Sequence, residues 1–188
     1  MIGIDDEKFI RGKIPMTKQE IRILTLAKAQ IDSDSIVVDV GAGTGSITVE
    51  AARLAKNGKV FAVERNLEAI ELIKQNIEKF SVDNVEIICA EAPDALKTLP
   101  TLDAAIIGGS GGRLEKILDI IHTKLKIGGK IVINAITIQT AATALAYFRS
   151  NNIKYDAFQV QITRLKKIRA YDMNQVLNPI WIVTAEKI

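Results

Sequence analysis

The most informative stretch of this 188-residue chain is Ile36-Val37-Val38-Asp39-Val40-Gly41-Ala42-Gly43-Thr44-Gly45-Ser46. Residues 36–40 are largely apolar and β-branched, which predicts a short strand buried on both faces. Three glycines at alternating positions follow, and residues 47–55 have the pattern of a helix. Glycines allow a tight turn and let a ligand approach the backbone closely. A helix N-terminus presents free N–H groups and the positive end of its dipole to such a ligand.

The spacing of the glycines indicates which of two kinds of ligand the turn binds. A dinucleotide-binding turn has the pattern G-x-G-x-x-G and places a pyrophosphate over the helix. Here the pattern is D-x-G-x-G-x-G, with Asp39 two residues before Gly41. A carboxylate at this place would repel a diphosphate and attract an ammonium group. The alternative without a ligand is a glycine turn that only closes an ordinary strand–helix unit.

This stretch resembles the first motif of the Rossmann-like S-adenosylmethionine methyltransferases, whose ligand carries an ammonium and a sulfonium and no phosphate. The resemblance implies S-adenosyl-L-methionine as the cofactor. The positions that match this first motif are Asp39, Gly41, Ala42, Gly43, Thr44 and Gly45.

Two later acids extend the candidate cofactor site. Glu64 ends a predicted strand over residues 59–64, where its carboxylate can accept hydrogen bonds from both ribose hydroxyls, and Arg65 follows it. A surface acid at a strand end is the alternative. A third predicted strand over residues 84–89 leads into Ala-Glu-Ala, where the resemblance implies that Glu91 and Ala92 contact the adenine. The usual form of that turn is Gly-Asp-Ala, so the match is imperfect.

A second glycine-rich loop follows a predicted strand over residues 102–107. By resemblance, the end of this strand faces the transferred methyl group, and Gly108 belongs to the cofactor site. Successive glycine N–H groups before a helix form a nest for anions, and an arginine adds a fork that fits a carboxylate. A flexible turn followed by a solvated arginine is the alternative. The candidate substrate-binding residues in this loop are Gly109, Ser110, Gly111, Gly112 and Arg113.

Strand and helix patterns alternate from residue 36 to residue 149, which predicts an α/β fold with a parallel sheet and helices on both faces. Two further strands are predicted over residues 155–165 and 180–186, and the basic residues 164–169 are interpreted as a solvated strand face. Near the N-terminus, Thr17 is a plausible helix N-cap, with Glu20 completing a capping box.

Composition restricts the class of protein. The length fits one domain, residues 1–188, and 48% of the residues are apolar, as in a globular protein. The net charge of +3 does not require nucleic acid as a partner. One cysteine excludes a disulfide framework, and one histidine excludes a histidine-based metal cluster or catalytic triad. Neither a signal sequence nor a long apolar span is visible, so we expect a cytoplasmic protein without a membrane segment.

Several stretches together resemble the CbiT-type precorrin methyltransferases of cobalamin biosynthesis, which methylate carbon 15 of a precorrin and remove a carboxyl group. The stretches are FIRGKIPMTKQEIR (9–22), VDVGAGTGSITVEAA (38–52), IIGGSGG (106–112), GGKIVINA (128–135) and LNPIWIV (177–183). The resemblance implies a class I methyltransferase fold, with a doubly wound, mostly parallel seven-stranded sheet and an antiparallel last strand. It also implies a homotetramer and a tetrapyrrole substrate, with or without cobalt.

In this resemblance, residues 1–30 form a segment that covers the substrate and cofactor. Thr17 then belongs to the cofactor site, and Arg11 and Lys13 are candidates for binding substrate carboxylates. Methyl transfer from a sulfonium mainly needs the reactants held in line, and orientation alone can contribute on the order of 7–11 kcal/mol. No catalytic histidine or cysteine is therefore required, and we assign no catalytic residue.

Four other functions stay open from the sequence. A tRNA adenine methyltransferase would be expected to have an added RNA-binding domain and a stronger basic balance. An isoaspartyl repair enzyme would share the fold. Outside the methyltransferases, the chain could be a cofactor-binding protein without activity or, less consistent with the glycine spacing, a nicotinamide dehydrogenase.

Overall fold

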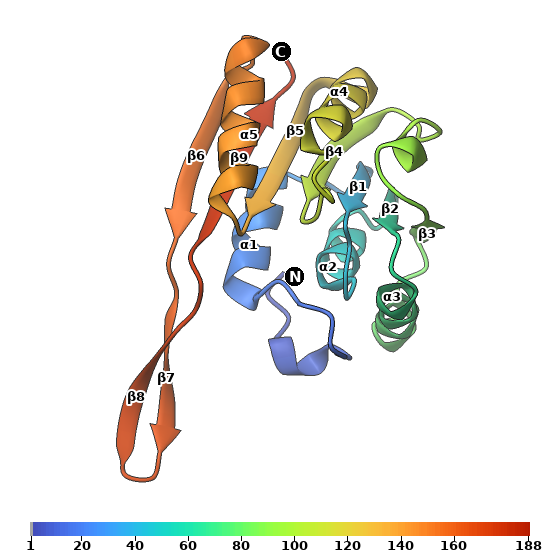
Figure 1. Ribbon diagram of the computed structural model, residues 1–188. Coiled ribbons are helices and arrows are strands. Elements are labelled where there is room, and N and C mark those ends of the chain that lie inside the picture. Colours follow the sequence, from blue (N-terminus) through green and yellow to red (C-terminus); the bar gives the residue numbers. More distant parts are fainter. Residues whose placement is uncertain (1) are drawn as a thin grey trace.

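A computed structural model describes residues 2–188 and contains a seven-stranded sheet in the order β3-β2-β1-β4-β5-β9-β6 (Figure 1). The strands are β1 (Ile36–Val40), β2 (Lys59–Glu64), β3 (Val85–Cys89), β4 (Leu102–Ile107), β5 (Leu125–Ala135), β6 (Tyr155–Val160) and β9 (Ile180–Glu186). Strands β1 to β5 pair in parallel, and β9 runs antiparallel to both β5 and β6. The predicted fold class, including the antiparallel last strand, is confirmed.

Helices cover both faces of this sheet, as the alternation of strands and helices predicts (Figure 1). They are α1 (Gln19–Ala29), α2 (Ser46–Leu54), α3 (Leu67–Lys79), α4 (Leu114–Lys124) and α5 (Ile138–Ser150), with short 3₁₀ turns at η1 (Asp6–Lys8) and η2 (Asp94–Leu96). Successive strand residues point to opposite faces. Val37 of β1 thus packs in the core under α1 and α2, and Val38 packs in the core under α4 and α5. Both cores need apolar side chains, which explains the apolar run of residues 36–38 at the start of β1.

The start of α1 differs from the prediction. The helix begins at Gln19 with Lys18 in the N-cap position, and no side chain caps it. Glu20 does not complete a capping box, because its two carboxylate oxygens accept hydrogen bonds from Arg164 at 3.1 and 2.6 Å. The predicted N-cap role of Thr17 is therefore wrong.

The strand predicted over residues 155–165 is also wrong in its extent. It ends at Val160, and the basic stretch forms a separate antiparallel hairpin of β7 (Thr163–Ile168) and β8 (Tyr171–Val176). We call this hairpin the arm, because it projects away from the body of the molecule (Figure 1). Charged and apolar residues alternate irregularly along it, so the periodicity did not indicate that the strand leaves the sheet.

A buried arginine fixes the N-terminal segment to the body. Arg22 is 0% exposed and donates to Glu50 at 2.9 Å, to Asp6 at 2.7 Å and to the carbonyl oxygens of Ile4 and Thr17. A buried guanidinium is tolerated only when it is paired and fully hydrogen-bonded. Because these partners come from residues 4–17 and from α2, Arg22 holds the segment across the end of the sheet where the glycine turn lies.

Candidate functional site

Two glycine loops meet at the carboxyl ends of β1 and β4, where the order of the strands reverses direction. Ligands of open α/β sheets bind at such a switch point. The backbone N–H groups of Gly108 and Gly109 donate to Val40 O at 2.9 and 3.2 Å. Gly41 has a φ of +72°, and a Cβ atom there would lie 2.7 Å from the backbone of Gly109. Only glycine fits at position 41, which explains the first glycine of the motif.

Asp39 lies at the end of β1 and is 1% exposed. The Thr48 hydroxyl of α2 donates to its carboxylate at 2.6 Å. Burial raises the pKa of Asp39 to about 6, and the charge of Glu64 adds to the rise, whereas the hydrogen bond from Thr48 opposes it. The protein therefore holds a carboxylate that is poorly solvated and has no cationic partner within the described residues, a state that favours binding of a cation.

Glu64 is fixed by backbone donors on both sides of the site. The N–H of Gly43 donates to one carboxylate oxygen at 3.0 Å, and the N–H groups of Arg65 and Asn66 donate to the other at 2.8 and 2.9 Å. Asn66 then caps α3, because its side-chain oxygen accepts hydrogen bonds from the N–H groups of Glu68 and Ala69. Glu64 thus links the glycine turn to the end of β2. Its carboxylate also lines a cleft beside β2.

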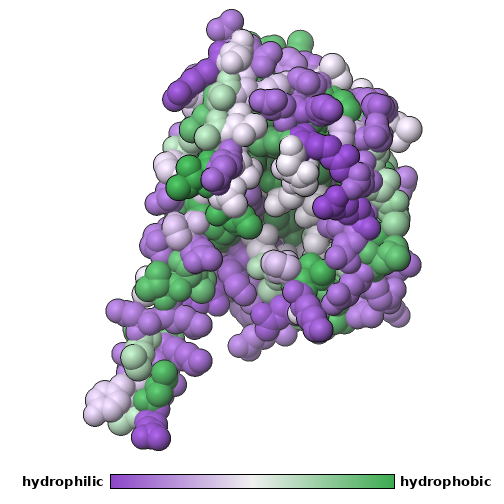
Figure 2. All heavy atoms as spheres, in the orientation of Figure 1, coloured by the Kyte–Doolittle hydropathy of each residue, from purple (hydrophilic) through white to green (hydrophobic). Residues whose placement is uncertain are grey.

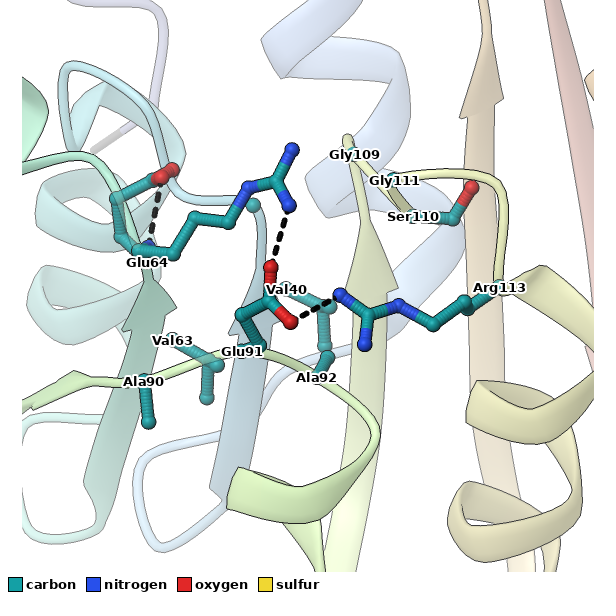
Figure 3. Close-up of a pocket in the computed structure, with 12 residues that line it drawn as sticks. Val40, Val63, Glu64, Ala90, Glu91, Ala92, Gly109, Ser110, Gly111 and Arg113 are labelled. Carbon is teal, nitrogen blue, oxygen red and sulfur yellow. Dashed lines mark hydrogen bonds and ion pairs between the residues drawn. The ribbon is translucent and has the colours of Figure 1, made fainter.

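Glu64 lines a hollow between the ends of β1, β2 and β3 and the second glycine loop, which we call the Glu64 cleft (Figure 3). Glu91 and Arg113 point toward each other across it, with 2.5 Å between Glu91 Oε2 and the guanidinium. Arg65 binds the other oxygen of Glu91, also at 2.5 Å. Hydrogen bonds from the two arginines hold the pKa of Glu91 below its usual range, and the one from Arg113 has the larger effect. The lining residues are Val40, Gly41, Val63, Glu64, Arg65, Ala90, Glu91, Ala92, Gly109, Ser110, Gly111 and Arg113.

The Asp39 cleft lies on the opposite side of Gly41, under the N-terminal segment. It brings residues 15–18 against the glycine turn, and it places Asp39 and Thr17 in one hollow. The lining residues are Pro15, Met16, Thr17, Lys18, Asp39, Gly41, Ala42, Gly43, Thr44, Ser46, Ile47, Gly108, Asn134, Ile136 and Ile180.

The glycine-loop cleft lies beyond Gly108, between the second glycine loop and the start of α5. Its lining residues are Ile107, Gly108, Gly109, Ser110, Gly111, Gly112, Ile133, Asn134, Ile136, Thr137 and Thr140. Gly108, Asn134 and Ile136 line both this cleft and the Asp39 cleft. The three clefts therefore form one continuous site around Gly41 and Gly108.

Most of the predicted site residues line these clefts, with three exceptions. Gly45 lies beneath the turn, where a Cβ atom would be 3.2 Å from Ile73 of α3. Arg11 and Lys13 are exposed on the N-terminal segment and line none of the three clefts. The sequence reasoning gave no role to Asn134, whose signal is a lone amide at the end of an apolar strand.

The strand order with its antiparallel β9, the glycine turn after β1 and the acid at the end of β2 define a Rossmann-like methyltransferase. Residues 8–187 match the family model described as precorrin methyltransferase domain. The chain is 46% identical to a protein of Sulfolobus acidocaldarius named probable cobalt-precorrin-6B C(15)-methyltransferase (decarboxylating), over 98% of this chain and 97% of that protein. This chain belongs to the precorrin methyltransferase family.

Two solved structures have the same fold over nearly their whole length. A precorrin-6y C5,15-methyltransferase from Geobacter metallireducens has a TM-score of 0.94 and 40% identity, and covers 99% of this chain and 98% of its own. A precorrin 8w decarboxylase from Methanobacterium thermoautotrophicum has a TM-score of 0.93 and 34% identity. The match covers 97% of this chain and 98% of the decarboxylase.

The buried carboxylate leads to a prediction about stability. The pKa of Asp39 is about 6 in the folded protein and about 3.8 in an unfolded chain, so the carboxylate destabilises the fold increasingly as pH rises from 4 to 6, and fully above that. Asp39→Asn keeps the shape and an acceptor for Thr48. We expect it to raise the free energy of unfolding at pH 8 by on the order of 2–3 kcal/mol, and hardly at all at pH 4.

Urea unfolding at the two pH values measures this difference. The matched control is Asp83→Asn, which removes an exposed carboxylate and should leave the difference between the two pH values unchanged. An Asp39→Asn protein that is less stable than the native one at pH 8 would contradict the prediction.

Proposed function

We propose that this chain transfers a methyl group from S-adenosyl-L-methionine to carbon 15 of a precorrin, with or without cobalt, and releases carbon dioxide from a ring acetate. The name of the S. acidocaldarius relative supports this reaction, because the match covers nearly the whole of both chains. The observation that carries the proposal is that Asp39 and Glu64 line two separate clefts that both border Gly41, so that one ligand passing over the turn can meet both carboxylates.

The residues around the turn fit this cofactor. Asp39 offers a desolvated negative charge to the ammonium group of the amino-acid end, and Glu64 offers a fixed carboxylate to the ribose hydroxyls. The adenine would lie against the Glu64 cleft near Glu91 and Ala92. The proposed cofactor-binding residues are Thr17, Asp39, Gly41, Ala42, Gly43, Thr44, Glu64, Arg65, Glu91, Ala92 and Gly108, with Gly45 supporting the turn from beneath.

The glycine-loop cleft fits a flat tetrapyrrole with carboxylates around its edge. Arg113 lines a neighbouring hollow that shares Ser110, Gly112 and Thr140 with this cleft, so its guanidinium can meet such carboxylates at the cleft's edge, and residues 110–112 offer backbone N–H groups. Ile136 lines this cleft and is 72% exposed, so it offers an apolar surface on which a macrocycle face can pack. We further propose that the N-terminal segment, up to residue 30, covers the bound molecules, so that Arg11 and Lys13 meet the outer carboxylates.

In this reaction the protein positions the cofactor and the substrate relative to each other. When bound, S-adenosyl-L-methionine supplies an electrophilic methyl group, and an electron-rich ring carbon of the substrate is the nucleophile. The two glycine loops bring both clefts to Gly108, so that the reacting atoms can lie in line. Loss of carbon dioxide leaves an electron pair that the conjugated macrocycle can accept, and Arg113 would hold a neighbouring carboxylate of the substrate during this step.

The arm supports the proposed homotetramer. Its apolar side chains lie open on both faces of the hairpin, and Figure 2 shows them as green patches among purple ones along the projection. An isolated two-stranded hairpin is marginally stable in water. The exposed apolar residues are Leu165, Ile168, Tyr171, Met173 and Val176. We propose that arms of neighbouring copies pack together and bury them.

We also propose a cytoplasmic location. The single cysteine, Cys89, is exposed and unpaired, as is usual in a reducing compartment. Across residues 2–188, none of the helices has both the length and the apolar character that a membrane crossing needs.

Mass spectrometry tests the proposed reaction. Purified protein is incubated with S-adenosyl-L-methionine and a late precorrin, with and without cobalt. We expect a product heavier by one methyl group and lighter by one carbon dioxide. A methyl gain alone would contradict the decarboxylation, and no change in any corrinoid, despite cofactor binding, would contradict the substrate.

Light scattering after size exclusion tests the arm. We expect the native chain to have about four times the monomer mass of 20.6 kDa. The double variant Leu165→Lys with Met173→Lys places charges in the proposed contact and should give a much smaller assembly. Lys167→Ala on the same arm is the control and should keep the native mass. A monomeric native chain, or a double variant of native mass, would contradict the proposal.

A further inference from the structure

Asn134, at the carboxyl end of β5, has an unusual hydrogen-bond state. It is 6% exposed. Among residues 2–188, two buried side-chain polar atoms have no hydrogen-bond partner, Asp6 Oδ2 and Asn134 Nδ2. The first lies 3.5 Å from the guanidinium of Arg164, which compensates its charge. One end of the Asn134 amide is therefore the buried group that the protein leaves without any partner.

The neighbouring threonine decides which end of the amide is free. Thr25 Oγ1 lies 2.7 Å from Ile21 O and 3.0 Å from Asn134 Oδ1. A hydroxyl has one proton, and two oxygens 2.7 Å apart repel each other unless a proton lies between them. Thr25 therefore donates to Ile21 O and accepts from Asn134. The amide turned by 180°, which keeps its shape, directs the NH₂ group to Thr25 and leaves the oxygen free.

The position of Asn134 suggests what the free oxygen meets. Asn134 is one of the three residues common to the Asp39 cleft and the glycine-loop cleft, and the other two, Gly108 and Ile136, have no polar side-chain atom. A buried acceptor without a partner destabilises the folded protein, so a ligand that donates a hydrogen bond to it recovers part of that cost. A group that passes from the cofactor to the substrate must cross this boundary between the clefts.

We propose that the side-chain oxygen of Asn134 holds the sulfonium methyl group of S-adenosyl-L-methionine in line with the substrate, with Thr25 as the residue that orients the amide. This inference rests on the proposed function. The positive sulfur polarises the C–H bonds of the methyl group, which makes them weak hydrogen-bond donors to an amide oxygen. The product, S-adenosylhomocysteine, has no methyl group and a neutral sulfur, so it gains nothing from this oxygen.

Calorimetric binding of S-adenosyl-L-methionine and S-adenosylhomocysteine tests the inference. Asn134→Leu keeps a similar volume and removes the oxygen. We expect it to weaken binding of S-adenosyl-L-methionine about two- to fivefold and to leave binding of S-adenosylhomocysteine unchanged. Asn134→Asp retains an acceptor and should not reduce the preference for S-adenosyl-L-methionine over S-adenosylhomocysteine. The control Asn57→Leu makes the same chemical change at an exposed site far from the clefts.

The outcomes separate this inference from the proposed function. An equal loss of both affinities in Asn134→Leu, or no loss, would overturn the assignment of the oxygen to the sulfonium methyl group. A native chain that binds neither molecule would overturn the proposed cofactor, and the inference with it.

Discussion

The buried carboxylate of Asp39 is the constraint on which the site depends. It sits at the end of a strand that is apolar on both faces, with one hydroxyl from Thr48 as its side-chain partner. Burial raises its pKa to about 6, so the folded protein keeps a charge that its own interior disfavours. Such an arrangement reduces stability and is typical of functional sites. The first glycine turn, the N-terminal segment and α2 all surround this one group.

The second constraint is the close approach of two loops. Gly41 and Gly109 touch through their backbones, which closes the gap between β1 and β4 and leaves open clefts on three sides. Ion pairs formed by residues outside the sheet hold the segments around these clefts in place. Arg22 fixes the N-terminal segment over one cleft, and Glu91 joins two arginines over another. Binding and placement thus depend on segments that differ widely in sequence position.

Much of this was predictable from the sequence, because the decisive features are local. The apolar run before Asp39, the glycine spacing and the acid that ends β2 each depend on neighbouring residues, and the parallel sheet follows from the alternation of strands and helices. Features set by distant contacts were not predictable. Glu20 bonds to Arg164 rather than capping α1, and the arm leaves the sheet without a change in periodicity. The unpaired end of the Asn134 amide likewise depends on a distant contact, the one with Thr25.

The most direct measurement of the account is the proton released on cofactor binding, obtained by calorimetry in buffers of different ionisation enthalpy. If Asp39 has a pKa of about 6 and pairs with an ammonium group, binding of S-adenosyl-L-methionine at pH 6 should release roughly half a proton. The release should vanish at pH 8 and in Asp39→Asn. No release at pH 6, or an equal release in Asp39→Asn, would contradict the central role of this buried carboxylate.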